Sequence, residues 1–149
     1  MPVAFASKRF SLRKLVFPLF DTDFHGRLLV VFDYLVQMQI NLSLLGDVPV
    51  FHLAGRLDAS TAPVIEERLG LLLEEGGKQV VFACDDLDYV SRAGLRVFII
   101  TLKATKTRGG GMAVAGLQNP VRELFHLAGL EELFVLAPTP HEAAAGLKS

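Results

Sequence analysis

The chain has 149 residues, 51% of them hydrophobic, and a formal net charge of −1 at pH 7. This length suits one domain with its own core and is too short for two domains of ordinary size. The apolar content excludes an intrinsically disordered protein, and the balanced charge lacks the basic excess of nucleic-acid-binding proteins, so we expect no direct contact with nucleic acid.

Cysteine and histidine usage argues against disulfides and metal sites. Cys84 is the single cysteine, so no internal disulfide can form, and its apolar neighbours Val81 and Phe82 indicate a buried thiol. A lone reduced thiol is typical of the cytoplasm, which is the compartment we expect. The four histidines are scattered without zinc-ligand spacing, so we expect no metal and no other cofactor.

The first 37 residues are predicted to form an N-terminal arm. Apolar clusters and basic residues mix there without a sustained helical or strand period. The apolar stretch 28–45 is interrupted by Asp33 and Asn41, among others, and the N-terminus lacks a signal-peptide pattern, so we expect no membrane insertion. The arm is either a loosely held extension or the product of a start upstream of a true initiator at Met38. In both cases it should add little to a domain spanning residues 38–149.

Strand and helix patterns alternate regularly after the arm. Polar and apolar residues alternate over residues 39–45, and a Gly-Asp turn joins them to a second apolar segment over residues 48–54, which predicts a β-hairpin. A helix is expected over residues 62–75. Ser60 or Thr61 can serve as its N-cap.

The second half of the chain repeats strand and helix in turn. The predicted elements are a buried strand at 80–84, a helix at 92–107, a buried strand at 112–115, a helix at 120–128, a strand at 133–136 and a helix at 141–147. Strands that alternate with crossover helices predict an α/β fold with a mainly parallel sheet.

An acidic segment follows the strand predicted at 80–84. Asp85, Asp86 and Asp88 could suggest a metal site, but no further ligands accompany them, and a solvated loop is the better interpretation. No nucleophile–base pair or carboxylate dyad can be argued from this chain, so we do not expect an enzyme.

Three segments together show a family resemblance. They are Gly-Arg-Leu-Asp at 55–58, Tyr-Val-Ser-Arg-Ala-Gly-Leu-Arg-Val at 89–97, and Val-Arg-Glu-Leu-Phe at 121–125 followed by Ala-Gly-Leu at 128–130. Their order and spacing make the chain resemble the STAS family, named for sulphate transporters and anti-sigma factor antagonists. The resemblance implies a mixed sheet of four to five strands with helices packed mainly on one side. It also implies a partner-binding loop of Ser91, Arg92, Ala93 and Gly94, beside Asp58.

The function that the resemblance implies is regulation by binding. An anti-sigma factor antagonist binds an anti-sigma factor, here one of the serine-kinase type, and so releases a sigma factor. In regulated members of the family the kinase phosphorylates a serine in the loop and separates the two proteins. The matching position is Arg92, which has no hydroxyl, and Ser91 is the remaining candidate acceptor. The alternative is a STAS subunit or adaptor of a larger complex, in lipid ABC transport or in stress sensing.

Two of these residues also have ordinary structural explanations. Ser91 can act as an N-cap by accepting a bond from the N–H of Ala93 or Gly94, which stabilises a helix by ~1 kcal/mol. Asp58 can either shape a partner contact or accept N–H bonds from the next turn, and the sequence leaves both open.

Arg92 is harder to explain by local structure. It would lie in the first turn of a helix, where a cation is disfavoured by ~0.3–1 kcal/mol. A carboxylate on a partner therefore explains Arg92 better than solvent does.

Overall fold

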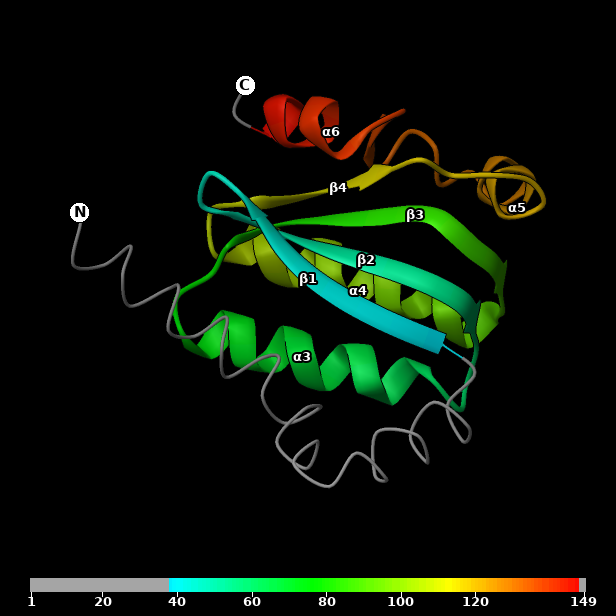
Figure 1. Cartoon of the computed structure of the whole chain (residues 1–149), viewed down its shortest axis with the longest axis horizontal. Helices are drawn as coiled ribbons and strands as arrows, with labels where there is room; N and C mark the ends of the chain where they lie inside the picture. The colour runs from blue at the N-terminus through cyan, green and yellow to red at the C-terminus, as the bar shows by residue number, and fades with distance from the viewer. Residues whose placement is uncertain (1–37, 148–149) are drawn as a thin grey trace.

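The computed structural model describes residues 38–147, which form a five-stranded sheet with helices on both faces (Figure 1). The strands lie in the sheet in their order along the chain: β1 (Met38–Leu45), β2 (Val48–Leu57), β3 (Gln79–Val90), β4 (Gly111–Ala115) and β5 (Val135–Ala137). The first two strands pair antiparallel and the other pairs are parallel. The predicted mixed sheet is confirmed.

The β1–β2 hairpin forms where the alternation predicted it. Met38 pairs with Gly55 and Leu45 with Val48, so the register runs from one end of β1 to the other. The turn places Gly46 at φ +65°, a conformation that glycine adopts at low cost. β2 continues three residues beyond the predicted strand, to Leu57.

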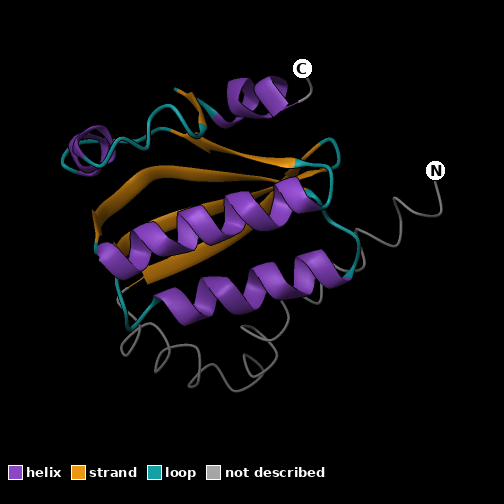
Figure 2. Ribbon diagram, turned by 180° about the vertical axis from the view of Figure 1, so that it is seen from behind, coloured by secondary structure: helices purple, strands orange, loops and turns teal. Residues whose placement is uncertain are grey.

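Three helices share the main core. α3 (Ala62–Glu74) and α4 (Arg92–Thr107) lie side by side on one face of the sheet (Figure 2), and α5 (Val121–Leu127) adds to the same apolar cluster. Phe82, Phe98 and Phe125 run through this cluster in edge-to-face contacts, with ring centroids 5.2 and 5.1 Å apart. Buried apolar residues of all three helices therefore belong to one core.

One short helix covers the opposite face of the sheet. α6 (Pro140–Leu147) buries Ala143 and Ala144 against a second, smaller cluster of sheet residues. Small alanine side chains allow this helix to approach the sheet closely. The helices therefore lie mainly on one side, as the family resemblance implied.

The prediction of a loop at Asp85 and Asp86 is wrong, because β3 continues through both residues to Val90. β2 and β3 stay paired along this length, with two shifts of register that break the regular alternation of buried and exposed side chains. Leu87 and Val90 are buried beyond the acidic pair and hold the strand on the core.

The last strand is also displaced, from the predicted 133–136 to 135–137, because the N–H of Leu133 bonds the carbonyl of Leu130 and forms a turn there.

The predicted helix at 120–128 ends as expected. Gly129 has φ +71°, and the N–H of Leu130 bonds the carbonyl of Phe125 at 2.9 Å, which completes a Schellman motif. Within residues 38–147 no helix combines the length and apolarity needed to cross a membrane. The expectations about residues 1–37 lie outside the described residues.

Candidate functional site

The predicted site residues meet at the carboxyl ends of β2 and β3. β2 ends at Leu57 and leads into Asp58, while β3 ends at Val90 and leads through Ser91 into α4. The two strands are parallel neighbours, so both loops leave the sheet at the same edge. The N–H of Ser91 donates to the carbonyl oxygen of Leu57 at 2.9 Å and joins the loops directly. In open α/β sheets this edge is the usual place for ligands.

Gly94 lets the start of α4 approach the end of β2. A Cβ at this position would lie 2.6 Å from the carbonyl oxygen of Leu57 and 2.8 Å from a side-chain carbon of Val90. Both distances are shorter than real Cβ contacts. A glycine is therefore needed for the contact between the two loops.

Ser91 caps α4. Its backbone is extended, and its hydroxyl oxygen accepts the N–H of Gly94 at 3.3 Å. The predicted cap is confirmed with Gly94 as the donor. The neighbouring Ala93 is half-buried, whereas Arg92 is exposed.

Asp58 has the structural role that was one of its two predicted explanations. Its Oδ1 accepts bonds from the hydroxyl of Ser60 at 2.7 Å, from the N–H of Ser60 at 3.0 Å and from the N–H of Thr61 at 3.3 Å. These bonds, led by the one from the Ser60 hydroxyl, lower the pKa of Asp58 despite some desolvation. The carboxylate is therefore occupied by its own loop.

Thr61 is the residue at the N-cap position of α3, but its hydroxyl does not cap the helix. The hydroxyl oxygen accepts the N–H of Asp58 at 2.9 Å and donates to the carbonyl of Arg56 at 2.9 Å. Since Thr61 is buried, these bonds fasten the loop from within.

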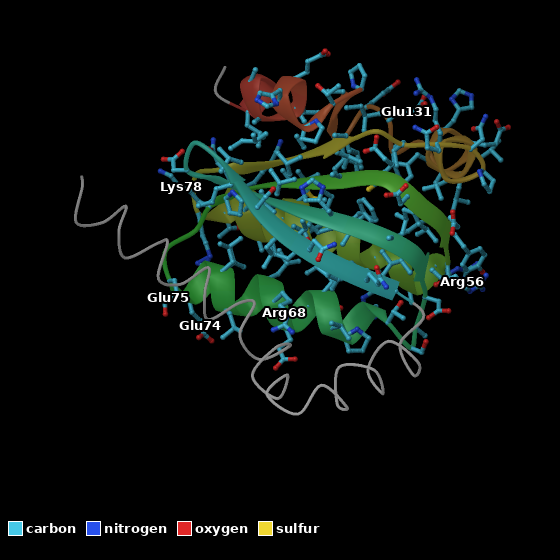
Figure 3. The ribbon with its side chains drawn as sticks, viewed as in Figure 1. Arg56, Arg68, Glu74, Glu75, Lys78 and Glu131 are labelled. Atoms are coloured by element: carbon cyan, nitrogen blue, oxygen red, sulfur yellow. The ribbon has the colours of Figure 1, made fainter. Side chains whose placement is uncertain are left out.

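Sequence reasoning missed a second pair of residues at this edge. The guanidinium of Arg56 lies 4.1 Å from the ring centroid of Tyr89, and its Nε is 3.9 Å from Oδ2 of Asp58. Figure 3 shows Arg56 at the same end of the molecule as α5. Both residues lie in the segments that show the family resemblance, but their contact depends on the β2–β3 register, which pairs Arg56 with Tyr89.

A hollow opens between the start of α4 and α5. Its volume is about 530 Å³. The lining residues are Tyr89, Val90, Ser91, Arg92, Leu95, Pro120, Val121 and Leu124. It brings the third segment of the family resemblance, at 121–125, beside the loop predicted to bind a partner. We call it the α4–α5 hollow.

The other candidate groups do not form a site. Among residues 38–147 no three His, Cys, Asp or Glu side chains gather closely enough to hold a metal ion. Cys84 is buried as predicted, and burial, with a smaller effect of Asp85, raises the pKa of its thiol. An unpredicted feature is Arg68 on α3. It is only 2% exposed, and its Nε and Nη1 lack a hydrogen-bond partner within the described part of the chain.

Comparison with known proteins supports this fold. A model of the STAS domain family matches residues 39–143. The anti-sigma-B factor antagonist of Bacillus subtilis is 33% identical over 82 residues, which are 55% of this chain and 74% of the relative. BtrV of Bordetella bronchiseptica, provisionally named an anti-sigma factor antagonist, is 29% identical over 112 residues, which are 75% of this chain and 97% of the relative.

A solved structure supports the same assignment of fold. The Bacillus cell fate determinant SpoIIAA in its phosphorylated form aligns with a TM-score of 0.60 at 16% identity, over 72% of this chain and 97% of that one. The family match covers both loops of the site and all of the described strands apart from Met38, the first residue of β1. The chain belongs to the STAS domain family.

Proposed function

We propose that this protein is an anti-sigma factor antagonist, which binds an anti-sigma factor and so releases the sigma factor that it holds. The carrying observation is that the STAS family match spans the two loops joined by the Ser91–Leu57 bond, in a chain that is similar to named antagonists. The protein acts by binding and not by catalysis. Its place of action is the cytoplasm, where sigma factors meet RNA polymerase.

The geometry of the site suits a docking role. Both loops are fixed by hydrogen bonds to their own backbone and side chains before any partner arrives. A surface that is already ordered loses less conformational entropy on binding than a mobile one. The exposed Arg92 and the adjacent hollow supply a charge and an apolar surface to a partner.

The second part of the proposal concerns regulation. The partner is an anti-sigma factor of the serine-kinase type, but the usual phosphorylation switch does not operate here, because Arg92 occupies its position and has no hydroxyl. The hydroxyl oxygen of Ser91 accepts a backbone bond and the residue is half-buried, so it is a poor substitute. Phosphorylation would add about −1.5 to −2 charges to the docking surface. Without this modification the charge of the surface stays the same.

Release of a sigma factor is the direct test of the function. A purified complex of a sigma factor with its anti-sigma factor, both from the source genome, is titrated with this protein and followed by size-exclusion chromatography. We expect free sigma factor to appear in proportion to the protein added, up to saturation. A STAS adaptor would instead release none and would co-purify with a larger assembly.

Phosphopeptide mapping tests the regulatory part. Chain isolated from its native cells should show no phosphate over residues 79–108. Arg92→Ser places a hydroxyl at the usual position and should become a substrate of the partner kinase with ATP. Stoichiometric phosphate on Ser91 of the native chain, with loss of binding, would contradict the proposal.

A further inference from the structure

Resting on the proposed function, we infer that the α4–α5 hollow is the anchor pocket for the anti-sigma factor. It takes one large apolar side chain from a segment of that protein, and a carboxylate beside this side chain pairs with Arg92. The inference adds α5 to the binding surface and states the chemistry of the segment that is bound.

The walls of the hollow are apolar and come from two helices. Leu95 projects from α4 and Leu124 from α5, and both are only half-buried although they pack against the main core. Val121 is 2% exposed and Tyr89 40% exposed, so the lining passes from core to surface. Apolar surface that remains open next to polar residues marks interaction sites in soluble proteins.

The charge of the residues that line the hollow indicates which group the bound segment carries. Of the residues that line the hollow in the described part of the chain, Arg92 alone carries a charge. It is exposed, no ion pair joins it to another described residue, and no acidic side chain lies in the first turn of α4. The positive end of the α4 dipole and the guanidinium therefore act together on an incoming anion. A carboxylate on the partner satisfies both.

The occupant is a protein segment and not a small molecule. Small-molecule sites enclose most of the ligand and aim several polar groups at it. Here the hydroxyl oxygen of Ser91 already accepts the N–H of Gly94, which leaves few polar groups free around an open apolar hollow. Grooves between two helices instead accept apolar side chains from a partner helix or segment.

The rim of the hollow carries a tyrosine and an arginine, residue types that are common at the centre of protein interfaces. Tyr89 is held by the guanidinium of Arg56, whose carbon lies 4.1 Å from the ring centroid. Tyr and Arg are enriched among the residues that dominate binding energy at protein interfaces. Because the stack is already formed, Tyr89 needs no reordering when a partner arrives.

Two pairs of variants test the inference against the anti-sigma factors of the source genome, each purified and titrated by calorimetry. The first pair is Leu124→Gln and Leu127→Gln, the same change on the same helix. Leu124 lines the hollow, whereas Leu127 is 74% exposed and lies outside it. We expect Leu124→Gln to weaken binding at least tenfold and Leu127→Gln to stay within twofold of the unaltered protein.

The second pair needs no change in the core, in case Leu124→Gln disturbs α5. Arg92→Glu should weaken binding at least tenfold, whereas Arg108→Glu, the same charge change at the other end of α4, should stay within twofold. Thermal unfolding checks that all four variants are folded. Equal binding by both members of each pair would overturn the anchor pocket and leave the proposed function intact. Absence of binding to every anti-sigma factor by the unaltered protein would overturn both.

Discussion

The two long helices begin in similar places and in different ways. α3 and α4 each start at the carboxyl end of a parallel strand, within the same edge of the sheet. Before α3, the carboxylate of Asp58 and the hydroxyl of Thr61 bond to their own loop, with five contacts of 3.3 Å or less. Before α4, the Ser91 hydroxyl forms one bond to the helix, and Arg92 stays exposed beside the hollow.

The difference is between polar groups that stabilise their own loop and groups that remain available to a partner. Polar groups that are satisfied within the loop stabilise the fold and have little capacity left for a partner. An exposed guanidinium beside open apolar surface contributes little to the fold and is available to a partner. We therefore propose that, of the two predicted parts of the site, the Asp58 loop supports the fold and the start of α4 binds the partner.

The largest effect should come from the contact between the two helix starts. Gly94→Ala places a methyl group 2.6 Å from the carbonyl oxygen of Leu57, and overpacking of this kind costs ~1–3 kcal/mol. Gly70→Ala is the matched control, because its Cβ would meet nothing within 4 Å, and there the better helix former should stabilise α3 by ~0.5–1 kcal/mol. Urea unfolding measures both. Equal stability of Gly94→Ala and the unaltered chain would show that the loops do not need this close approach.

A smaller contrast distinguishes the two loops. Thr61→Val keeps the shape of the side chain but leaves the N–H of Asp58 and the carbonyl of Arg56 without their bonds, which should cost ~1–3 kcal/mol. Ser91→Ala removes a single cap bond and should cost ~1 kcal/mol. The free energy of unfolding of each variant gives the order. A larger loss for Ser91→Ala would reverse the roles that we assign to the loops.

The smallest expected effect is a dependence of the stability of the fold on pH. A carboxyl group whose pKa is lower in the folded chain stabilises the fold at neutral pH, and this contribution is lost as the pH falls through the folded value. The pKa of Asp58 is lowered in this way, so stability should fall on acidification below about pH 4. Asp58→Asn should flatten that part of the unfolding curve. Ser60→Ala should reduce it, because the Ser60 hydroxyl is the main cause of the shift. If both variants lost stability below about pH 4 as the unaltered chain does, the role that we assign to Asp58 would be contradicted.

Local patterns in the sequence predicted most of the fold. The alternation before residue 46 and the helical spacing around Phe98 each report burial within one element, and both were confirmed. The cap at Ser91 was equally local. The continuation of β3 was missed because its register shifts hide the strand period behind two exposed aspartates. The buried Arg68 was missed because a charged residue next to Glu67 suggests a solvated helix face.

The parts of the site that were missed depend on distant segments. The stack of Arg56 on Tyr89 requires the parallel register of β2 and β3, which no single segment encodes. The hollow requires α5 to lie beside the start of α4, and only the folded chain brings Leu124 near Leu95. The sequence therefore predicted residues of a candidate site, whereas their arrangement in space depends on the tertiary structure.

Hydrogen exchange of the full chain, alone and in complex with the anti-sigma factor, tests the central claim most directly. The account predicts slower exchange on binding at residues 89–96 and 118–125, around the start of α4 and the hollow, with α6 and β1 unchanged. Arg92→Glu at the same concentrations should lose that protection, and Arg108→Glu should keep it. Protection confined to α6, or a complex that leaves residues 89–96 unprotected, would contradict the assignment of this edge of the sheet as the docking surface.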